Sequence, residues 1–340
     1  MNQDDSLLAD ARQQALALEA EVARAVIGQP QVLRLLNTSV FARGHVLLQG
    51  DVGVGKTTLL RAFAQVLGGA FARIEGSVDL MPNDLLYYTY INEAGRPAVE
   101  PGPLIAQGEN LAIFLFNEIN RARPQVHALM LRAMAERSVQ AFNRTFDLPH
   151  LLVFADRNRV EREETFEISS AARDRFMMEI TIEAPTADAE RCALVFDPRF
   201  HDTERLVSTL TPALLDHRQL NAASQAVQRH VRASQALQTY ALALWRATAT
   251  PAEFGVKLSG TDAAQLVLAG ASPRGMSLML RAARTAAWLD GRDFVTPEDV
   301  QAVFTPTLSH RLVFQPVYEM QRHAIAPLLM PAILAAVAAP

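Results

Sequence analysis

Residues 50–57, which read Gly-Asp-Val-Gly-Val-Gly-Lys-Thr, have the types and spacing of a phosphate-binding loop. They fit the pattern G-x-x-x-x-G-K-[ST], and a short apolar run precedes them while a helical run follows. In such a loop backbone N–H groups and the positive end of the following helix dipole surround a β-phosphate. The alternative, a structural glycine-rich turn, is disfavoured by those flanking elements. We therefore expect ATP to contact Asp51, Val52, Gly53, Val54, Gly55, Lys56, Thr57 and Thr58.

Within this loop two side chains have chemical tasks. Lys56 can reach the β- and γ-phosphate oxygens, and Thr57 can bind Mg²⁺ through its hydroxyl group. ATP and Mg²⁺ are thus the expected cofactors.

A second pair of polar residues, Asn117 and Glu118, ends the apolar run 111–116. A P-loop ATPase needs an Asp followed by a Glu at this place, because the Asp accepts from Mg²⁺-bound water and the Glu orients the attacking water. Glu118 is present, but Asn117 has no negative charge and predicts weaker placement of the metal. On this basis we expect Asn117→Asp to raise ATP turnover about ten- to a hundredfold.

The elements that must position these residues alternate between strand and helix. Short apolar runs of the kind that form buried parallel strands occur at 45–50, 70–74, 111–116, 151–155 and 177–182. Helical stretches separate them, which is typical of an α/β fold with a five-stranded parallel sheet. Alternation around Asn143 and Arg144 predicts a β-hairpin over 138–148. After Pro185 the strand signal disappears, so an all-α second domain is expected.

Three groups of residues together resemble the MoxR family of AAA+ ATPases. They are the loop 50–57, the run Asn117-Glu118-Ile119-Asn120-Arg121, and Gly270-Ala271-Ser272-Pro273-Arg274. The resemblance implies a P-loop αβα sandwich, an insertion near residues 76–100, and a helical lid. It divides the chain into an N-terminal helix (1–24), a nucleotide-binding domain (25–185), a lid (186–310) and a helical tail (311–340).

The same resemblance assigns further site residues by position. Asn158 matches the residue that holds the γ-phosphate and the attacking water, although a polar residue after a strand is often an ordinary turn former. Arg175 resembles an arginine finger, and Arg274 resembles the residue that couples the lid to the phosphates. The segment Val26, Ile27 and Gly28 matches the part that covers the adenine.

The family resemblance implies an ATP-driven chaperone that remodels or matures a protein complex or metalloenzyme. Such proteins form homo-oligomers, usually hexamers, and act with a protein client and commonly with a von Willebrand factor A domain partner. A nucleotide-dependent assembly switch that turns over slowly because of Asn117 is the alternative from a different class. A nucleic-acid motor is a third reading.

The composition of the chain disfavours some of these functions. With 32 basic and 36 acidic residues the net charge is −4, which offers no general attraction to nucleic acid. The amino-terminal residues lack the pattern of a secretory signal and no apolar run is long enough for a membrane span, so a cytoplasmic protein is expected. The eight histidines lack metal-ligand spacing and are expected at the surface or in caps, while Cys192 is expected to pack as an inert thiol.

Overall fold

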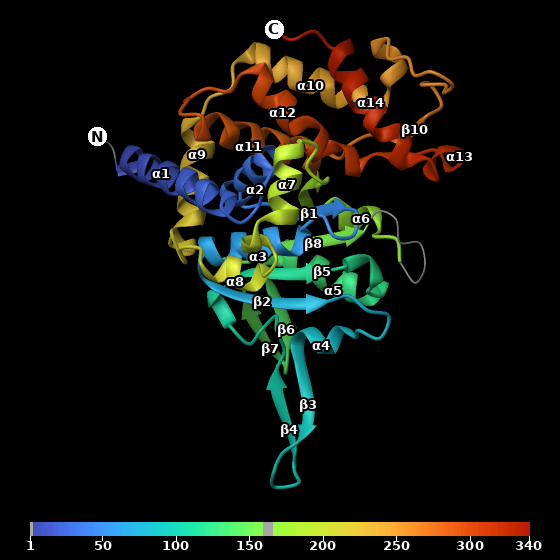
Figure 1. Ribbon diagram of the computed structural model, residues 1–340. Coiled ribbons are helices and arrows are strands. Elements are labelled where there is room, and N and C mark those ends of the chain that lie inside the picture. The colour runs from blue at the N-terminus through green and yellow to red at the C-terminus, as the bar shows by residue number, and fades with distance from the viewer. Residues whose placement is uncertain (1–2, 159–165) are drawn as a thin grey trace.

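A five-stranded parallel sheet forms the centre of the first part of the chain in the computed structural model, which describes residues 3–158 and 166–340 (Figure 1). The strand order across the sheet is β2-β5-β8-β1-β9. The strands are β1 (His45–Gly50), β2 (Ala70–Glu75), β5 (Leu111–Asn117), β8 (Leu152–Asn158) and β9 (Phe176–Thr181). All five lie where the apolar runs predict strands, which confirms the α/β fold.

Side chains that alternate along each strand enter two separate apolar cores, one on each face of the sheet. Leu48 and Phe154 pack on one face, whereas Leu47 and Val153 pack on the other. The first face carries α1 (Gln3–Ala23), α2 (Pro30–Phe41) and α3 (Lys56–Leu67), and the second carries α4 (Pro82–Leu86), α5 (Pro124–Glu136) and α6 (Ser170–Arg173). The result is the expected αβα sandwich.

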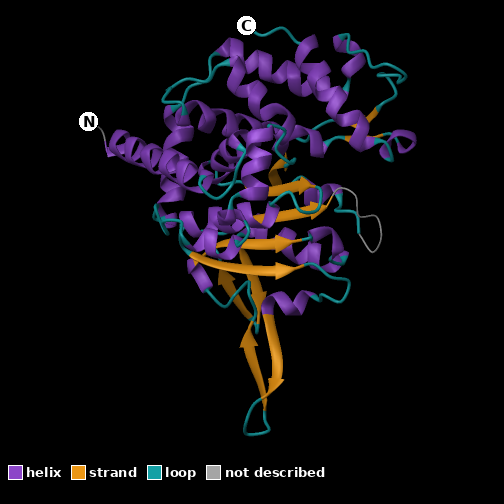
Figure 2. Ribbon diagram, in the orientation of Figure 1, coloured by secondary structure: helices purple, strands orange, loops and turns teal. Residues whose placement is uncertain are grey.

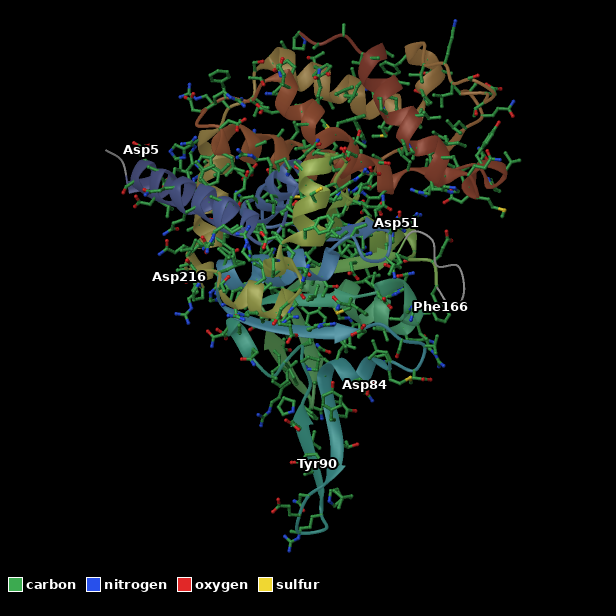
Figure 3. All side chains as sticks on the ribbon, in the orientation of Figure 1. Asp5, Asp51, Asp84, Tyr90, Phe166 and Asp216 are labelled. Atoms are coloured by element: carbon green, nitrogen blue, oxygen red, sulfur yellow. The ribbon has the colours of Figure 1, made fainter. Side chains whose placement is uncertain are left out.

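Two hairpins project from the second face (Figure 2). The predicted hairpin is formed by β6 (Ser138–Ala141) and β7 (Arg144–Asp147), with both Phe142 and Asn143 at positive φ. The insertion expected near 76–100 contains α4 and a longer hairpin of β3 (Tyr87–Ile91) and β4 (Pro97–Pro101). Tyr90 on this longer hairpin lies far from the lid in Figure 3.

Helices dominate the chain after the sheet. They are α7 (Asp188–Phe196), α8 (Thr203–Ser208), α9 (Leu220–His230), α10 (Gln235–Ala249), α11 (Pro273–Leu289), α12 (Pro297–Leu308), α13 (Pro316–Glu319) and α14 (Arg322–Ala336). A short antiparallel pair, β10 (Val267–Ala269) and β11 (Val313–Phe314), interrupts them and was not predicted. These strands have three and two residues, too few to give a periodic signal.

The start of α11 has residues of the types that favour the beginning of a helix. Ser272 caps the helix, since its Oγ accepts a hydrogen bond from the N–H of Gly275 at 3.0 Å, and Pro273 occupies the first turn. The run Thr296-Pro297-Glu298-Asp299 has the residue types of a capping box, and Thr296 and Asp299 form one at the start of α12.

Two expectations from the sequence need correction, and a third concerns residues that lie mostly outside the described ranges. His45, His127, His217 and His310 are buried rather than at the surface. The ring of His45 contacts α5 and β8, and the ring of His310 contacts β9. Cys192 is exposed, as α7 buries none of its residues. The run 157–164 mixes both signs of charge, which predicts a solvated face, but its residues from 159 onward lie outside the described residues. Among the described helices none has both the length and the apolar character to cross a bilayer.

Candidate functional site

The phosphate-binding loop connects β1 to α3, and its glycines have the backbone conformation that the loop needs. Gly53 and Gly55 have φ of 83° and 86°, which residues with a Cβ rarely adopt. Gly55 is the N-cap of α3, so the amino end of that helix points into the loop. This geometry provides converging backbone N–H groups and a helix dipole for an anion.

Lys56 is held inside the loop. Its side chain is 7% exposed, and Nζ donates to the carbonyl oxygens of Gly50 and Asp51 at 3.0 and 2.8 Å. Nζ also donates to Oδ1 of Asn158 at 2.7 Å. Lys56 and Asn158, which are 102 positions apart in the sequence, are therefore in direct contact.

Glu118 directly follows β5 and contacts the side chain of Asn158. Nδ2 of Asn158 donates to its Oε1 at 3.4 Å, and Nε of Arg121 lies 3.1 Å from its Oε2. The backbone of Glu118 is left-handed, with φ 50° and ψ 48°, a conformation that costs free energy for a residue other than glycine. Its N–H donates to Oδ1 of Asp156 at 2.5 Å, which stabilises this conformation.

Asn117 faces a guanidinium group rather than the loop. With the amide oriented so that both of its polar atoms are satisfied, Oδ1 accepts from Nε and Nη2 of Arg73 at 2.9 and 2.8 Å. Arg73 also donates to Glu75 at 3.1 Å. Asn117 is 3% exposed, whereas the side chains of Arg73 and Glu75 reach solvent, with exposed fractions of 38% and 65%.

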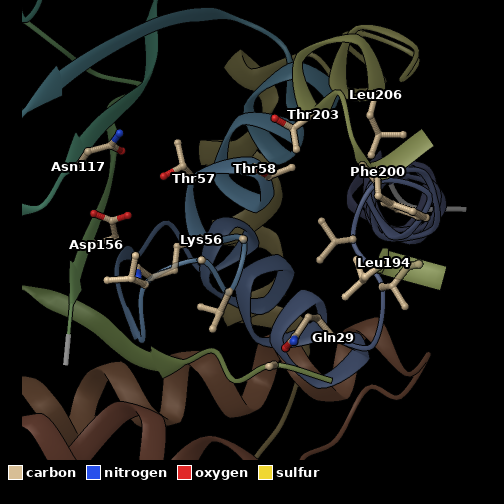
Figure 4. Close-up of a pocket in the computed structure, with 18 of the residues that line it drawn as sticks. Gln29, Lys56, Thr57, Thr58, Asn117, Asp156, Leu194, Phe200, Thr203 and Leu206 are labelled. Carbon is tan, nitrogen blue, oxygen red and sulfur yellow. The ribbon is translucent and has the colours of Figure 1, made fainter. Parts of the chain in front are cut away.

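Asp156 is a site residue that the sequence reasoning missed. It is 2% exposed, and Figure 4 shows its carboxylate beside Asn117 and facing Lys56. Burial raises the pKa of the Asp156 carboxyl, while the hydrogen bond from Glu118 and the charge of Lys56 act in the opposite direction. A signal was available, since Asp156 precedes Asn158 by two residues and so shares its side of β8.

A cleft of about 590 Å³ joins these groups to an apolar region. Val26 and Ile27 line it as expected, together with the loop residues from Val52 to Thr58. The sequence reasoning missed the other apolar wall, which comes from α7, α8 and the segment between them and consists of Leu194, Phe200 and Leu206 (Figure 4). This volume and mixed lining suit a nucleotide.

Two expected contact residues lie beside the cleft rather than in its lining. The Cα of Gly28 is packed so closely that a Cβ there would lie 2.6 Å from Glu190 and 2.9 Å from Pro185. The carbonyl of Asp51 accepts from Lys56, as described above.

Arg175 and Arg274 lie outside the cleft lining of this chain. Nη1 of Arg175 donates to the carbonyl of Ala171 at 2.8 Å. Nη1 of Arg274 pairs with Oδ2 of Asp174 at 2.7 Å, and the other oxygen of Asp174 accepts from Ser272 and Arg311 at 2.6 and 3.1 Å. Asp174 thus connects the end of the nucleotide-binding part to the lid.

Comparison with known proteins identifies the family. Residues 45–178 match the ATPase family associated with various cellular activities (AAA), and residues 259–327 match the AAA lid domain. The chain is 55% identical to Protein MoxR of Methylorubrum extorquens, over 99% of this chain and 98% of that protein. It belongs to the MoxR family of AAA+ ATPases.

Other relatives agree with this membership of the MoxR family. Protein MoxR of Paracoccus denitrificans is 53% identical over 99% of both chains. Chaperone MoxR1 of Mycobacterium tuberculosis is 34% identical over 90% of this chain and 77% of that protein. The crystal structure of a candidate ATPase from Cytophaga hutchinsonii superposes with a TM-score of 0.81 and 27% identity, covering 99% of this chain and 98% of the other.

Proposed function

We propose that this protein is a chaperone that hydrolyses ATP in the cleft and uses the free energy to remodel or mature a protein client. The observation that carries this proposal is the hydrogen-bonded series Lys56–Asn158–Glu118, which joins the phosphate-binding loop to the ends of two sheet strands. It brings a phosphate-binding cation, a polar amide and a carboxylate to one end of the cleft. These are the parts that phosphoryl transfer to water requires.

Each residue then has a distinct task. Lys56 exchanges its carbonyl partners for phosphate oxygens, and Asn158 positions the γ-phosphate and the attacking water. Glu118 orients that water and accepts its proton. The apolar wall around Phe200 packs against the adenine.

The donor set at this end of the cleft fits Mg²⁺, a hard cation that prefers oxygen ligands and keeps several of its waters. The hydroxyl of Thr57 and the carboxylates of Glu118 and Asp156 line the same cleft. Within the described residues no group of three or more His, Cys, Asp or Glu could form a metal centre by itself, which fits an ion that arrives with the nucleotide. Mg²⁺ bound with ATP would neutralise phosphate charge.

We further propose a homo-oligomeric ring, with a hexamer as the expected size. Because Arg175 lies outside the cleft of its own chain, it suits a role as a finger that reaches a neighbouring subunit. Arg274 would then exchange Asp174 for the phosphates when the lid closes. A chaperone role is supported by a relative named as a chaperone. A protein client and a von Willebrand factor A domain partner are proposed from the family resemblance alone.

A second candidate function, a slow nucleotide-dependent assembly switch, is favoured by one observation. Asn117 supplies no negative charge and gives its amide oxygen to Arg73. If the carboxylate missing there has no replacement, nucleotide would bind and drive assembly with little turnover.

Glu118→Gln tests the leading proposal. We expect ATP binding to persist and turnover to fall about 10²- to 10⁴-fold, because the amide cannot accept a proton from water. Calorimetry and phosphate release measure the two quantities. Glu136→Gln, the same change at an exposed residue at the end of α5, is the matched control. Wild-type protein that binds ATP without turnover favours the switch, and turnover that survives Glu118→Gln contradicts the assignment of the base.

A further inference from the structure

We propose that Asp156 supplies the negative charge that holds the water shell of nucleotide-bound Mg²⁺, the task that position 117 has in other P-loop ATPases. This inference rests on the proposed function. Asp156 lies far from the phosphate-binding loop in the sequence, but its strand β8 pairs with β1, the strand that leads into the loop. The carboxylate would thus have moved from β5 to the neighbouring strand.

Strand register brings Asp156 to the required place. β8 lies between β5 and β1, with Ala155 paired to Phe116 and Asp156 paired to Leu48. Asp156 directly follows Ala155, and Asn117 directly follows Phe116, the partner of Ala155. Asp156 and Asn117 therefore lie next to each other at the carboxyl edge of the sheet. Phe154, two residues earlier, packs in the core that also contains α3, so Asp156 points to the same face as the phosphate-binding loop.

Asn117 is unsuited to the task in this protein. A metal-bound water donates hydrogen bonds and requires an acceptor, but the acceptor of Asn117 is directed at two nitrogens of Arg73. What remains of its side chain is an NH₂ group, which is a donor. The guanidinium of Arg73 also places positive charge beside position 117, where it opposes a cation.

Among the described residues, the charges of the cleft distinguish Asp156 from Glu75 and Glu118, whose carboxylates also line it. Glu75 is paired with Arg73 at 3.1 Å, and Glu118 with Arg121 at 3.1 Å. Asp156 forms no ion pair with any arginine or lysine of the described residues, and its Oδ1 accepts a backbone N–H. Its second oxygen, Oδ2, receives no hydrogen bond from any donor in the described ranges 3–158 and 166–340.

Because Asp156 lines the cleft and its Oδ2 is not enclosed by protein, a cation or donor that enters the cleft can complete this carboxylate. Burial raises the pKa of Asp156 and the charge of Lys56 acts against this rise, but the amine of Lys56 donates to Gly50, Asp51 and Asn158. On ATP binding Lys56 turns toward the phosphates. The water molecules bound to Mg²⁺ would then supply the hydrogen-bond donors, and the ion the positive charge, that the carboxylate of Asp156 requires.

Asp156→Asn tests the inference with little structural change. Asn keeps an Oδ1 acceptor for the N–H of Glu118, so the left-handed turn is retained while the charge is removed. The affinity of a non-hydrolysable ATP analogue, adenylyl imidodiphosphate, is measured by calorimetry in Mg²⁺ and again in EDTA. The ratio of the two dissociation constants reports how much Mg²⁺ tightens binding, independently of turnover.

We expect Asp156→Asn to reduce this ratio about tenfold or more, the range of a hydrogen bond to a charged group. Affinity in EDTA should stay equal or increase, since a negative charge near the triphosphate is lost. Asp147→Asn, the same change at an exposed position of β7, should leave both values unchanged. Thermal denaturation confirms that each variant is folded.

The variant Asn117→Asp provides an independent test of the inference. Because Arg73 holds position 117 and Asp156 already supplies the charge, we expect little change in the ratio of dissociation constants. We also expect little of the gain in turnover, about ten- to a hundredfold, that the sequence alone predicts for this variant. A gain of about tenfold or more would show that the wild-type site lacks its carboxylate and would overturn the inference. An unchanged ratio in Asp156→Asn would overturn it too, with the proposed function intact. Wild-type protein that fails to bind the analogue in either buffer would refute the proposed function itself.

Discussion

His45 gives a prediction about pH that follows from its burial at the start of β1. Its side chain is 6% exposed, and the N–H of Val153 donates to Nδ1 at 2.9 Å. Nδ1 is therefore the acceptor, so the ring is neutral and its Nε2–H donates to the carbonyl of Met134 at 3.2 Å. Protonation of Nδ1 would break the bond to Val153 and place a charge in the core. Burial, and then the charge of Arg137, lowers the pKa of His45 to about 3.

The sign and size of the effect follow from the linkage between protons and folding. In the unfolded chain His45 takes up a proton near its ordinary pKa of about 6.5, whereas in the folded protein it does so near 3. The stabilisation is therefore complete above pH 6.5 and decreases as the pH falls toward 3. Each pH unit in this window is worth about 1.4 kcal/mol, so the free energy of unfolding should fall by about 2 kcal/mol between pH 7 and pH 5 from this residue alone.

His45→Gln isolates this contribution, because its amide offers an acceptor and a donor but does not titrate. Equilibrium urea unfolding, followed by far-ultraviolet circular dichroism, is measured for both proteins at pH 7 and pH 5. We expect the difference in free energy of unfolding between wild type and variant to shrink by about 2 kcal/mol at the lower pH. The other histidines titrate in both proteins and cancel. Parallel pH profiles for the two proteins would refute the reasoning.

Three more predictions concern the cleft and the lid. Lys56→Ala should abolish ATP binding, since the loop loses the cation that reaches the β- and γ-oxygens; an unchanged affinity in calorimetry would contradict the site. Arg175→Ala should keep ATP binding but suppress turnover of the oligomer, and mixing it with Lys56→Ala subunits should restore part of the activity. If confirmed mixed oligomers never regain turnover, a role in trans is unsupported. Asp174→Asn should lower the free energy of unfolding by about 3–5 kcal/mol, because the guanidinium of Arg311 is 1% exposed and would lose its counter-charge. Urea titration checks this, and a change below about 1 kcal/mol would show that the backbone carbonyls around Arg311 suffice.

The sequence by itself determined the parts of this protein that depend on local rules. The glycines and Lys56 of the loop, the five apolar runs, and the cap at Ser272 each have a backbone or spacing requirement within about a dozen residues. The sheet, the nucleotide loop and the start of α11 could therefore be predicted without coordinates. Glu118 could be named as well, because it follows a recognisable strand, whereas Asn158 could be named only through the family resemblance.

The tertiary structure alone decided which distant residues meet. That Arg73 takes the amide oxygen of Asn117, that Asp156 lies beside it, and that Asp174 pairs with Arg274 depends on strand order and register, which no local pattern in the sequence encodes. The burial of His45 has the same origin, since helix α5 and strand β8 cover it only once the sheet has formed. Local periodicity fixes the elements, whereas the charges a site residue meets are set by the neighbours that packing brings to it.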